Sequence, residues 1–195
     1  RGIMRLRSLF LAGCALLGLT GCVALRPVVP AMAHPNERAG YVAAATTQTG
    51  TVGTYGGINI PTVNIFMKGF ELGIDQYNTD NGTAVQLIGW SNEQDDGLFT
   101  GDFEDESKGR ANTESLIDQG ADVINASWGA TGASQAVADA VEYAHGSGAV
   151  FVAAAGNSNS DARDFYPASS PHAVAVSALD PADQKASFSN FGRKV

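Results

Sequence analysis

Apolar positions along the chain alternate between helical and extended spacing from residue 51 to residue 180. Three stretches have apolar residues three and four positions apart, the spacing of an amphipathic helix. The first begins at Pro61, a residue favoured in the first turn of a helix. The second is expected from about Lys108 to Gln119, and the third ends at Gly146. The first helix carries the apolar stripe Val63, Phe66, Met67, Phe70, Ile74 and Tyr77.

Short runs rich in apolar and β-forming residues separate these helices and predict strands. The run at 149–155 (AVFVAAA) is apolar at every position, as in a parallel sheet that is covered on both faces. Strands that alternate with helices indicate right-handed βαβ crossovers. We therefore predict an α/β fold: a parallel, doubly wound sheet in three layers, built from βαβ units. The expected strands are 51–55, 83–90, 121–128, 149–155 and 173–178.

The first 33 residues have the pattern of an export signal. Arg5 and Arg7 precede an uncharged run from residue 8 to residue 25. Residues 19–22 (LTGC) resemble the bacterial lipobox, so we expect lipidation of Cys22 and a membrane-anchored lipoprotein of the bacterial envelope. The Ala-Met-Ala sequence at 31–33 offers the alternative of ordinary signal cleavage after Ala33 and secretion, and an uncleaved anchor is a third possibility. Residues 34–50 are small, polar and aperiodic, which predicts a flexible linker.

Composition narrows the class of partner. The chain has 20 acidic and 12 basic residues, a net charge of −8, and no basic run, which argues against nucleic acid. Cys14 and Cys22, its only cysteines, lie in the export signal, so the remainder has no thiolate metal site. The acidic loop at 91–106 fails an EF-hand register because Phe103 falls where a bidentate acid is needed. We expect a solvated loop, no metal and no cofactor.

Residues 52–124 carry three ordered matches to one protein family: VGTYGGINIPTVNIFMKGFELGIDQYN, LIGW and GLFTGDFEDESKGRANTESLIDQGADVI. This stretch resembles the basic-membrane-protein family of substrate-binding lipoproteins. The resemblance implies binding of a nucleoside or a similar small molecule, which is passed to an ABC transporter. It also places Phe66 in a helix that borders the ligand cleft, where its ring could stack on a base. The helical periodicity instead assigns Phe66 to the core stripe.

Residues 121–195 carry matches to a second family: GADVINASWGA, SQAVADAVEYAHGSGAVFVAAAGNS and FYPASSPHAVAVSALDPADQKASFSNFG. This stretch resembles the subtilisin-like serine proteases. The resemblance implies that Ser127, Trp128 and Gly129 pair with the backbone of a peptide substrate. It implies that Ala153, Ala154, Ala155 and Gly156 line the pocket for the side chain before the scissile bond. It also makes Asn157 the side-chain donor to the oxyanion, a role worth about 10²–10³ in rate.

The catalytic residues of that family have no match. The chain lacks the Asp-Thr-Gly, His-Gly-Thr-His and Gly-Thr-Ser-Met motifs that supply the acid, the base and the nucleophile. Because these groups act as a unit, we predict a serine endopeptidase-type segment that is inactive alone. Three hypotheses follow from the sequence: an envelope lipoprotein with a partial subtilase domain, a nucleoside-binding lipoprotein of an ABC importer, and a chimeric sequence without evolved activity.

Overall fold

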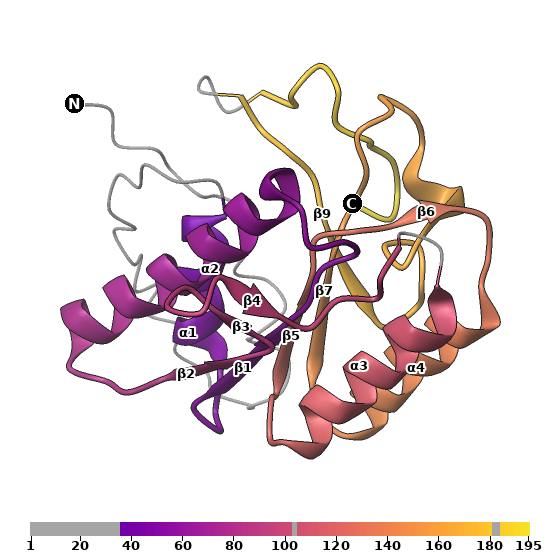
Figure 1. Ribbon diagram of the computed structural model, residues 1–195. Helices are drawn as coiled ribbons and strands as arrows, with labels where there is room; N and C mark the ends of the chain where they lie inside the picture. Colours follow the sequence, from indigo (N-terminus) through magenta and orange to yellow (C-terminus); the bar gives the residue numbers. More distant parts are fainter. Residues whose placement is uncertain (1–35, 103–104, 181–183) are drawn as a thin grey trace, which may run out of the picture.

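A five-stranded parallel sheet forms the centre of the protein (Figure 1), in a computed structural model that describes residues 36–102, 105–180 and 184–195. The strand order is β2-β1-β5-β7-β9. The predicted α/β fold with a parallel sheet is therefore confirmed. The expected lipidation at Cys22 and cleavage after Ala33 lie outside the described residues. The strands are β1 Thr51–Thr54, β2 Gln86–Ile88, β5 Val123–Ala126, β7 Val150–Ala154 and β9 Ala173–Val176.

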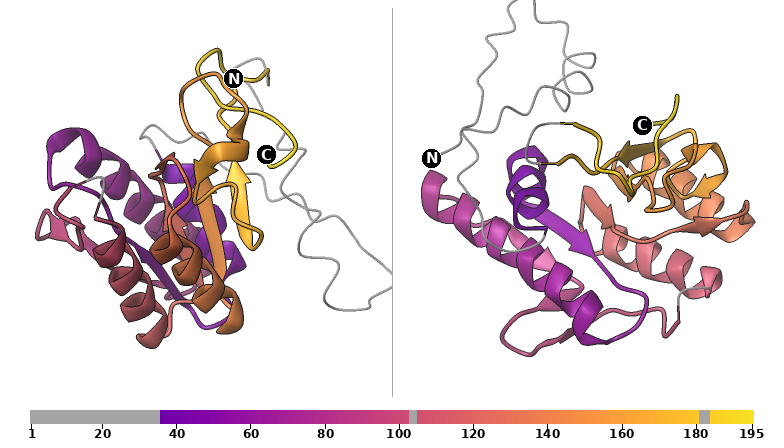
Figure 2. Two further views of the ribbon diagram at one scale, coloured as in Figure 1. Left: turned by 90° about the vertical axis from the view of Figure 1, so that its right-hand side faces the viewer. Right: turned by 90° about the horizontal axis from the view of Figure 1, so that it is seen from above.

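Four helices cover the two faces of the sheet (Figure 2). From β1 the chain crosses to β2 on one side, and from β5 it crosses to β7 on the other side, so the strand order reverses between β1 and β5. With right-handed crossovers this reversal puts the helices on opposite faces. The pairs are α1 Glu37–Thr46 with α2 Pro61–Asn81, and α3 Glu106–Asp118 with α4 Gln135–Gly146.

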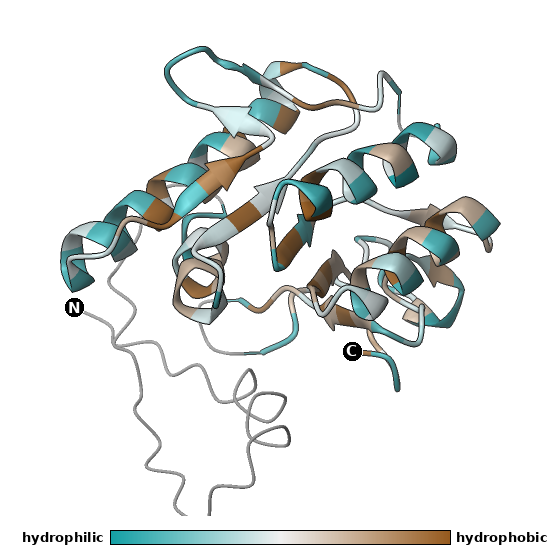
Figure 3. Cartoon of the chain, turned by 90° about the horizontal axis from the view of Figure 1, so that it is seen from below, coloured by the Kyte–Doolittle hydropathy of each residue, from teal (hydrophilic) through white to brown (hydrophobic). Residues whose placement is uncertain are grey.

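A hydrophobic cluster lies on each face of the sheet, and neighbouring residues of β5 point to different clusters. Ile124 packs with α3 and α4, in a cluster that includes Leu116, Val141 and Phe151. Val123 packs with α1 and α2, in a cluster that includes Phe70 and Ile74. This alternation is the period-2 geometry of a strand with apolar residues on both faces. Figure 3 shows hydrophobic residues along the strands and polar residues on the outward faces of the helices.

The prediction of a flexible linker over 34–50 is wrong from residue 37 to residue 46, which form α1. This helix was missed because, apart from Tyr41, its buried residues are small: Gly40, Ala43 and Ala44 give a weak hydrophobic period. Glycines let the backbones of α1 and α2 come into contact. A Cβ on Gly40 would lie 1.8 Å from the carbonyl oxygen of Phe70, and a Cβ on Gly73 would lie 1.8 Å from that of Glu37.

The core stripe of α2 is confirmed for Met67, Phe70 and Ile74, which are at most 4% exposed. It is wrong for Phe66, whose side chain is 46% exposed. Phe66 lies on the helix face turned away from the sheet, next to exposed Ile65. The fold therefore does not require the aromatic ring at this position.

The expected strand over 83–90 is shorter than predicted, because the chain turns at Gly89. Gly89 has φ +87°, and a Cβ there would lie 2.1 Å from the carbonyl oxygen of Thr54. After this turn, β3 Trp90–Ser91 pairs antiparallel with β4 Asp96–Gly97, so a hairpin occupies part of the acidic loop. A second small pair joins β6 Ala130–Thr131 to β8 Phe165–Tyr166, which follows the 3-10 turn η1 Ala162–Asp164.

In the described part of the chain, none of the helices combines the length and the apolar character needed to cross a bilayer.

Candidate functional site

A small pocket opens at the carboxyl ends of β1 and β5, where the strand order reverses. In open α/β sheets this is the position at which ligands generally bind. The loops after the two strands and the first turns of α3 and α4 supply its walls, and its volume is about 50 Å³. We call it the Trp128 pocket. Its lining includes Tyr55, Asp105, Glu106, Gly109, Trp128 and Gly129.

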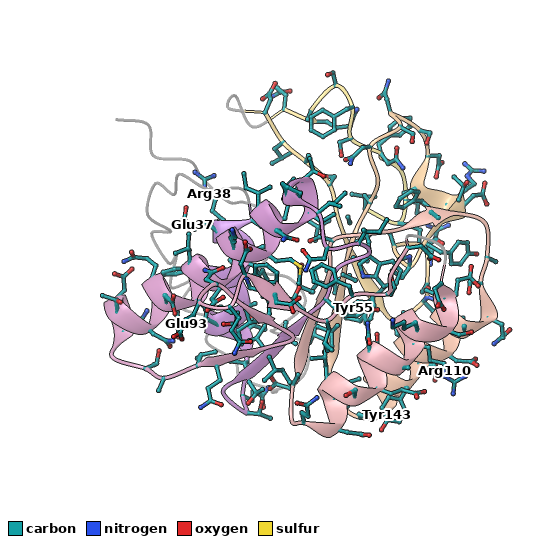
Figure 4. All side chains as sticks on the ribbon, viewed as in Figure 1. Glu37, Arg38, Tyr55, Glu93, Arg110 and Tyr143 are labelled. Carbon is teal, nitrogen blue, oxygen red and sulfur yellow. The ribbon has the colours of Figure 1, made fainter. Side chains whose placement is uncertain are left out.

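Tyr55 forms the inner end of this pocket and is only 3% exposed. Its hydroxyl donates to the carbonyl oxygen of Gly109 at 3.0 Å and lies 2.9 Å from the hydroxyl of Thr113. Burial raises the pKa of the Tyr55 phenol, so the side chain stays neutral. Figure 4 shows Tyr55 near the middle of the molecule, beside α3. The residue joins the end of β1 to α3 and presents its ring to the pocket.

Trp128 contributes the second aromatic ring. The ring centroids of Tyr55 and Trp128 lie 5.5 Å apart with planes tilted by 46°. The indole Nε1 of Trp128 is buried and has no hydrogen-bond partner among the described residues. A buried donor left without a partner costs about 1–3 kcal/mol, so an acceptor supplied by a ligand would be stabilising.

Two carboxylates line the pocket at the start of α3. Asp105 caps the helix and accepts from the amide of Lys108 at 2.9 Å. The carboxylate of Glu106 accepts from the hydroxyl of Ser134, which caps α4. Both side chains are exposed, and within the described residues neither forms a salt bridge.

Strand pairing is interrupted beside the pocket. β5 pairs with β7 as far as Ala126, and pairing resumes at Ala130 in β6. Residues 127–129, which we call the 127–129 segment, lie between these pairings and belong to no strand. The segment thus presents main-chain groups outside the sheet, and its last two residues also line the Trp128 pocket.

Among the described residues, the hydrogen-bond partners of Ser127 include no base. Its hydroxyl contacts the side chains of Asn125 at 3.0 Å and Asn36 at 3.2 Å, and an amide does not accept a proton at neutral pH. His145 is exposed at the end of α4 and stacks on His172 with ring centroids 3.8 Å apart. These histidines lie at the amino edge of the sheet, opposite the pocket, because α4 runs back from the carboxyl end of β5.

The second set of sequence-predicted residues follows the neighbouring strand. Ala126 pairs with Ala153, and β7 ends at Ala154, so residues 155–157 leave the sheet beside the 127–129 segment. Ala153 and Ala155 are 1% exposed, and Ala154 is half-buried. Gly156 has φ +102°, and a Cβ there would lie 2.4 Å from Nδ2 of Asn190. The chain then exposes the side chain of Asn157.

The structure thus brings Ser127, Trp128 and Gly129 to the same sheet edge as Ala153, Ala154, Ala155, Gly156 and Asn157. Only Trp128 and Gly129 of these line the pocket, and Phe66 does not. Sequence reasoning missed Tyr55, Asp105, Glu106 and Gly109 as site residues. The signal that could have found them is their position: Tyr55 follows the first strand, and the others lie at the start of the helix expected from about Lys108, so both are candidates for the edge at which a doubly wound sheet binds ligands.

Among the described residues, no group of three or more His, Cys, Asp or Glu side chains is placed to hold a metal ion.

A family model described as "Subtilase family" matches residues 26–195. Alkaline protease 1 of Aspergillus flavus is 51% identical over 72 residues, which is 37% of this chain and 18% of that protein. Fervidolysin of Fervidobacterium pennivorans is 32% identical over 147 residues, 75% of this chain and 17% of that protein. The chain therefore spans less than a fifth of the length of these curated relatives.

A solved ABC transporter solute-binding protein from Conexibacter woesei matches with a TM-score of 0.45 and 20% identity, over 61% of this chain and 33% of that one. The family match begins far upstream of residue 121, where the sequence resemblance to these proteases was expected to start. It includes residues 52–124, whose resemblance to binding lipoproteins stays a prediction.

Proposed function

Because the chain belongs to the subtilase family, we propose that it binds an extended peptide along the 127–129 segment and does not hydrolyse it by itself. The chain carries part of a serine protease domain, and peptides are the substrates that this family implies. The proposal concerns the described part of that domain.

The unpaired 127–129 segment is the observation that carries the proposal. An extended peptide recognises such a segment by adding a strand, with main-chain hydrogen bonds for affinity and nearby pockets for side chains. Residues 127–129 lie outside all strand pairing in the described chain, between the pairings of Ala126 and Ala130. The Trp128 pocket is beside them.

The absence of hydrolysis rests on the surroundings of Ser127. A serine nucleophile needs a base within hydrogen-bond reach, and the partners of this hydroxyl are the amides of Asn125 and Asn36. An oxyanion donor such as Asn157 stabilises a transition state only when a nucleophile attacks. The bound peptide is therefore held without cleavage.

The volume of the pocket favours a peptide over a nucleoside. Pockets for whole small molecules are roughly 300–1,000 Å³, whereas the Trp128 pocket measures about 50 Å³. This space is suited to the end of one side chain.

Export remains part of the proposal. The basic and apolar pattern of residues 1–33 supports delivery to the bacterial envelope with a lipid on Cys22, and cleavage after Ala33 is the alternative. Mass spectrometry of the mature N-terminus distinguishes a lipidated Cys22 from a chain that begins at His34.

Peptide binding can be tested with fluorescein-labelled acetyl-tetraalanine amide by fluorescence anisotropy. Two further peptides carry N-methyl groups on alternate residues, one on the odd and one on the even positions. A strand pairs through every second amide on one side. We therefore expect one N-methylated peptide to bind like the parent and the other to lose binding. Equal binding of both, or no saturable binding of the parent, would contradict the proposal.

A further inference from the structure

We propose that the Trp128 pocket selects a positively charged side chain, lysine or arginine, of the bound peptide. This inference rests on the proposed peptide binding and assigns the chemistry of one side chain in that peptide. It follows from the charge, the aromatic walls and the size of the pocket.

The pocket adjoins the 127–129 segment directly. Trp128 and Gly129 belong both to that segment and to the pocket lining. Side chains of an extended peptide alternate in direction, so a peptide paired here directs every second side chain toward one side. One of them is then aligned with the pocket opening.

The charge of the lining is negative. Asp105 and Glu106 are carboxylates, and no Lys or Arg side chain lines the pocket. Acidic groups nearby on α3 and α4 are already compensated: Arg110 pairs with Glu114 at 2.7 Å and with Asp139 of α4 at 2.6 Å. Within the described residues the two pocket carboxylates have no such cation. A positively charged group of the ligand would pair with these two carboxylates.

The walls are aromatic. Trp128 and Tyr55 both line the pocket, with ring centroids 5.5 Å apart. The Tyr55 hydroxyl is already bonded to Gly109 and Thr113, so the ring is the part of Tyr55 that a ligand can contact. Ammonium and guanidinium groups are attracted to the faces of such rings, most strongly to Trp. The rings also accommodate the apolar stem of the side chain.

Gly109 keeps the space open. A Cβ on this residue would lie 3.7 Å from the Tyr55 hydroxyl, 3.8 Å from Cγ2 of Thr100 and 3.9 Å from Cη2 of Trp128. These are ordinary contacts, so alanine fits the backbone, but its methyl group would sit among the side chains that line the pocket. Gly109→Ala therefore reduces the pocket without forcing the fold to move, and alanine is the better helix former.

The test uses three capped peptides, acetyl-X-Ala-Ala-Ala-amide, in which X is lysine, norleucine or glutamate. Norleucine has the length of lysine without its charge. Binding is followed by the fluorescence of Trp128 in a Trp90→Phe background, which leaves Trp128 as the single tryptophan. We expect the lysine peptide to bind about three- to tenfold more tightly than the norleucine peptide, and the glutamate peptide least.

Variants locate the effect. Asp105→Asn keeps a capping side chain, and Glu106→Gln keeps an oxygen that accepts from Ser134. Each should reduce the preference for lysine without weakening the norleucine peptide. Gly109→Ala should reduce the binding of both. Glu93→Gln removes the same charge from the β3–β4 hairpin, away from Tyr55 (Figure 4), and should leave all three affinities unchanged. Far-UV circular dichroism shows that each variant is folded.

The outcomes separate the inference from the proposed function. If lysine and norleucine peptides bind equally, the selection of a cation is wrong and peptide binding stands. If none of the three peptides binds to the folded protein, the proposed function is wrong, and the inference with it. A lysine preference that Glu93→Gln reduces as much as Glu106→Gln would show general attraction to an acidic protein, and it would overturn the inference.

Discussion

The side-chain nitrogen of Asn190 donates to the carbonyl oxygen of Ala155 at 2.9 Å. Its side-chain oxygen accepts from the amides of Ser158 at 2.9 Å and Ser160 at 3.1 Å. One amide, 1% exposed, thus closes the loop that carries Asn157. The loop is held from inside by Asn190, while Asn157 itself points to solvent.

We expect Asn190→Ala to lower the free energy of unfolding by about 1–3 kcal/mol, because buried main-chain groups lose their partner. Amide hydrogen exchange at residues 156–160 should accelerate more than exchange in β7. Asn157→Ala is the matched control, since this side chain is exposed, and it should change stability by less than about 0.5 kcal/mol. Equal losses in the two variants would contradict the internal role of Asn190.

The crossing of α1 and α2 depends on Gly73. A Cβ there would lie 1.8 Å from the carbonyl oxygen of Glu37, so Gly73→Ala must separate the helices. We expect a loss of about 1–3 kcal/mol in urea unfolding. Gly146→Ala, at the end of α4 with open space around its Cβ, should be neutral or slightly stabilising. A neutral Gly73→Ala would show that α1 does not dock as described.

Asp122 links stability to pH. Burial raises the pKa of its carboxyl, but hydrogen bonds from the hydroxyl of Thr47 and the amides of Gln48 and Thr49 outweigh that effect and lower it below the ordinary 3.8. A carboxyl with a depressed pKa in the folded state contributes its full stability above its unfolded pKa. That contribution is lost as the pH falls through the lower, folded value.

The free energies of unfolding of the parent and of Asp122→Asn in urea should therefore differ at pH 7 and begin to converge as the pH falls below about 3.8. Asp75→Asn, which removes one exposed charge from α2, is the control and should not reproduce this convergence. A constant difference between parent and Asp122→Asn at all pH values would contradict the linkage.

The isolated chain should not react as a serine protease. An alkyl fluorophosphonate probe labels a serine only when a base activates it, and Ser127 contacts amides. We expect no stoichiometric labelling by intact-mass spectrometry, with an active serine protease labelled in parallel. Labelling that disappears in Ser127→Ala would show that this hydroxyl is activated.

The sheet and three of its helices could be predicted because their apolar residues are large and regularly spaced. Phe70, Ile74, Val141 and Ile124 occupy the positions that a helix or strand period assigns to a core. Helix α1 could not be predicted in this way, since Gly40, Ala43 and Ala44 bury little apolar surface each and depend on close backbone contact with α2.

Phe66 shows the opposite error. Its spacing fits the stripe of α2, but Phe66 is 46% exposed, whereas Met67 and Phe70 on the same helix are buried. Periodicity predicts the face of the helix on which a side chain lies. Whether that side chain is buried depends on residues from elsewhere in the chain that pack against it.

The site was predictable only where it follows the strands. Ser127, Trp128 and Gly129 were named from the resemblance to subtilisin-like proteases, and the predicted strand over 121–128 included the first two, although β5 ends at Ala126. Asp105 was expected only as part of a solvated acidic loop. Its place beside Trp128 results from the docking of α3 against the ends of β1 and β5, which no local pattern records.

The position of β1 between β2 and β5 has a consequence for synthesis on the ribosome. Thr54 bonds to Asn125, which follows it by 71 residues, so one edge of β1 remains open until β5 has emerged. Such distant pairing slows folding relative to local contacts. A nascent chain stalled before residue 123 would hold β1, β2 and the helices α1, α2 and α3 without β5. Such a species exposes apolar surface that chaperones recognise.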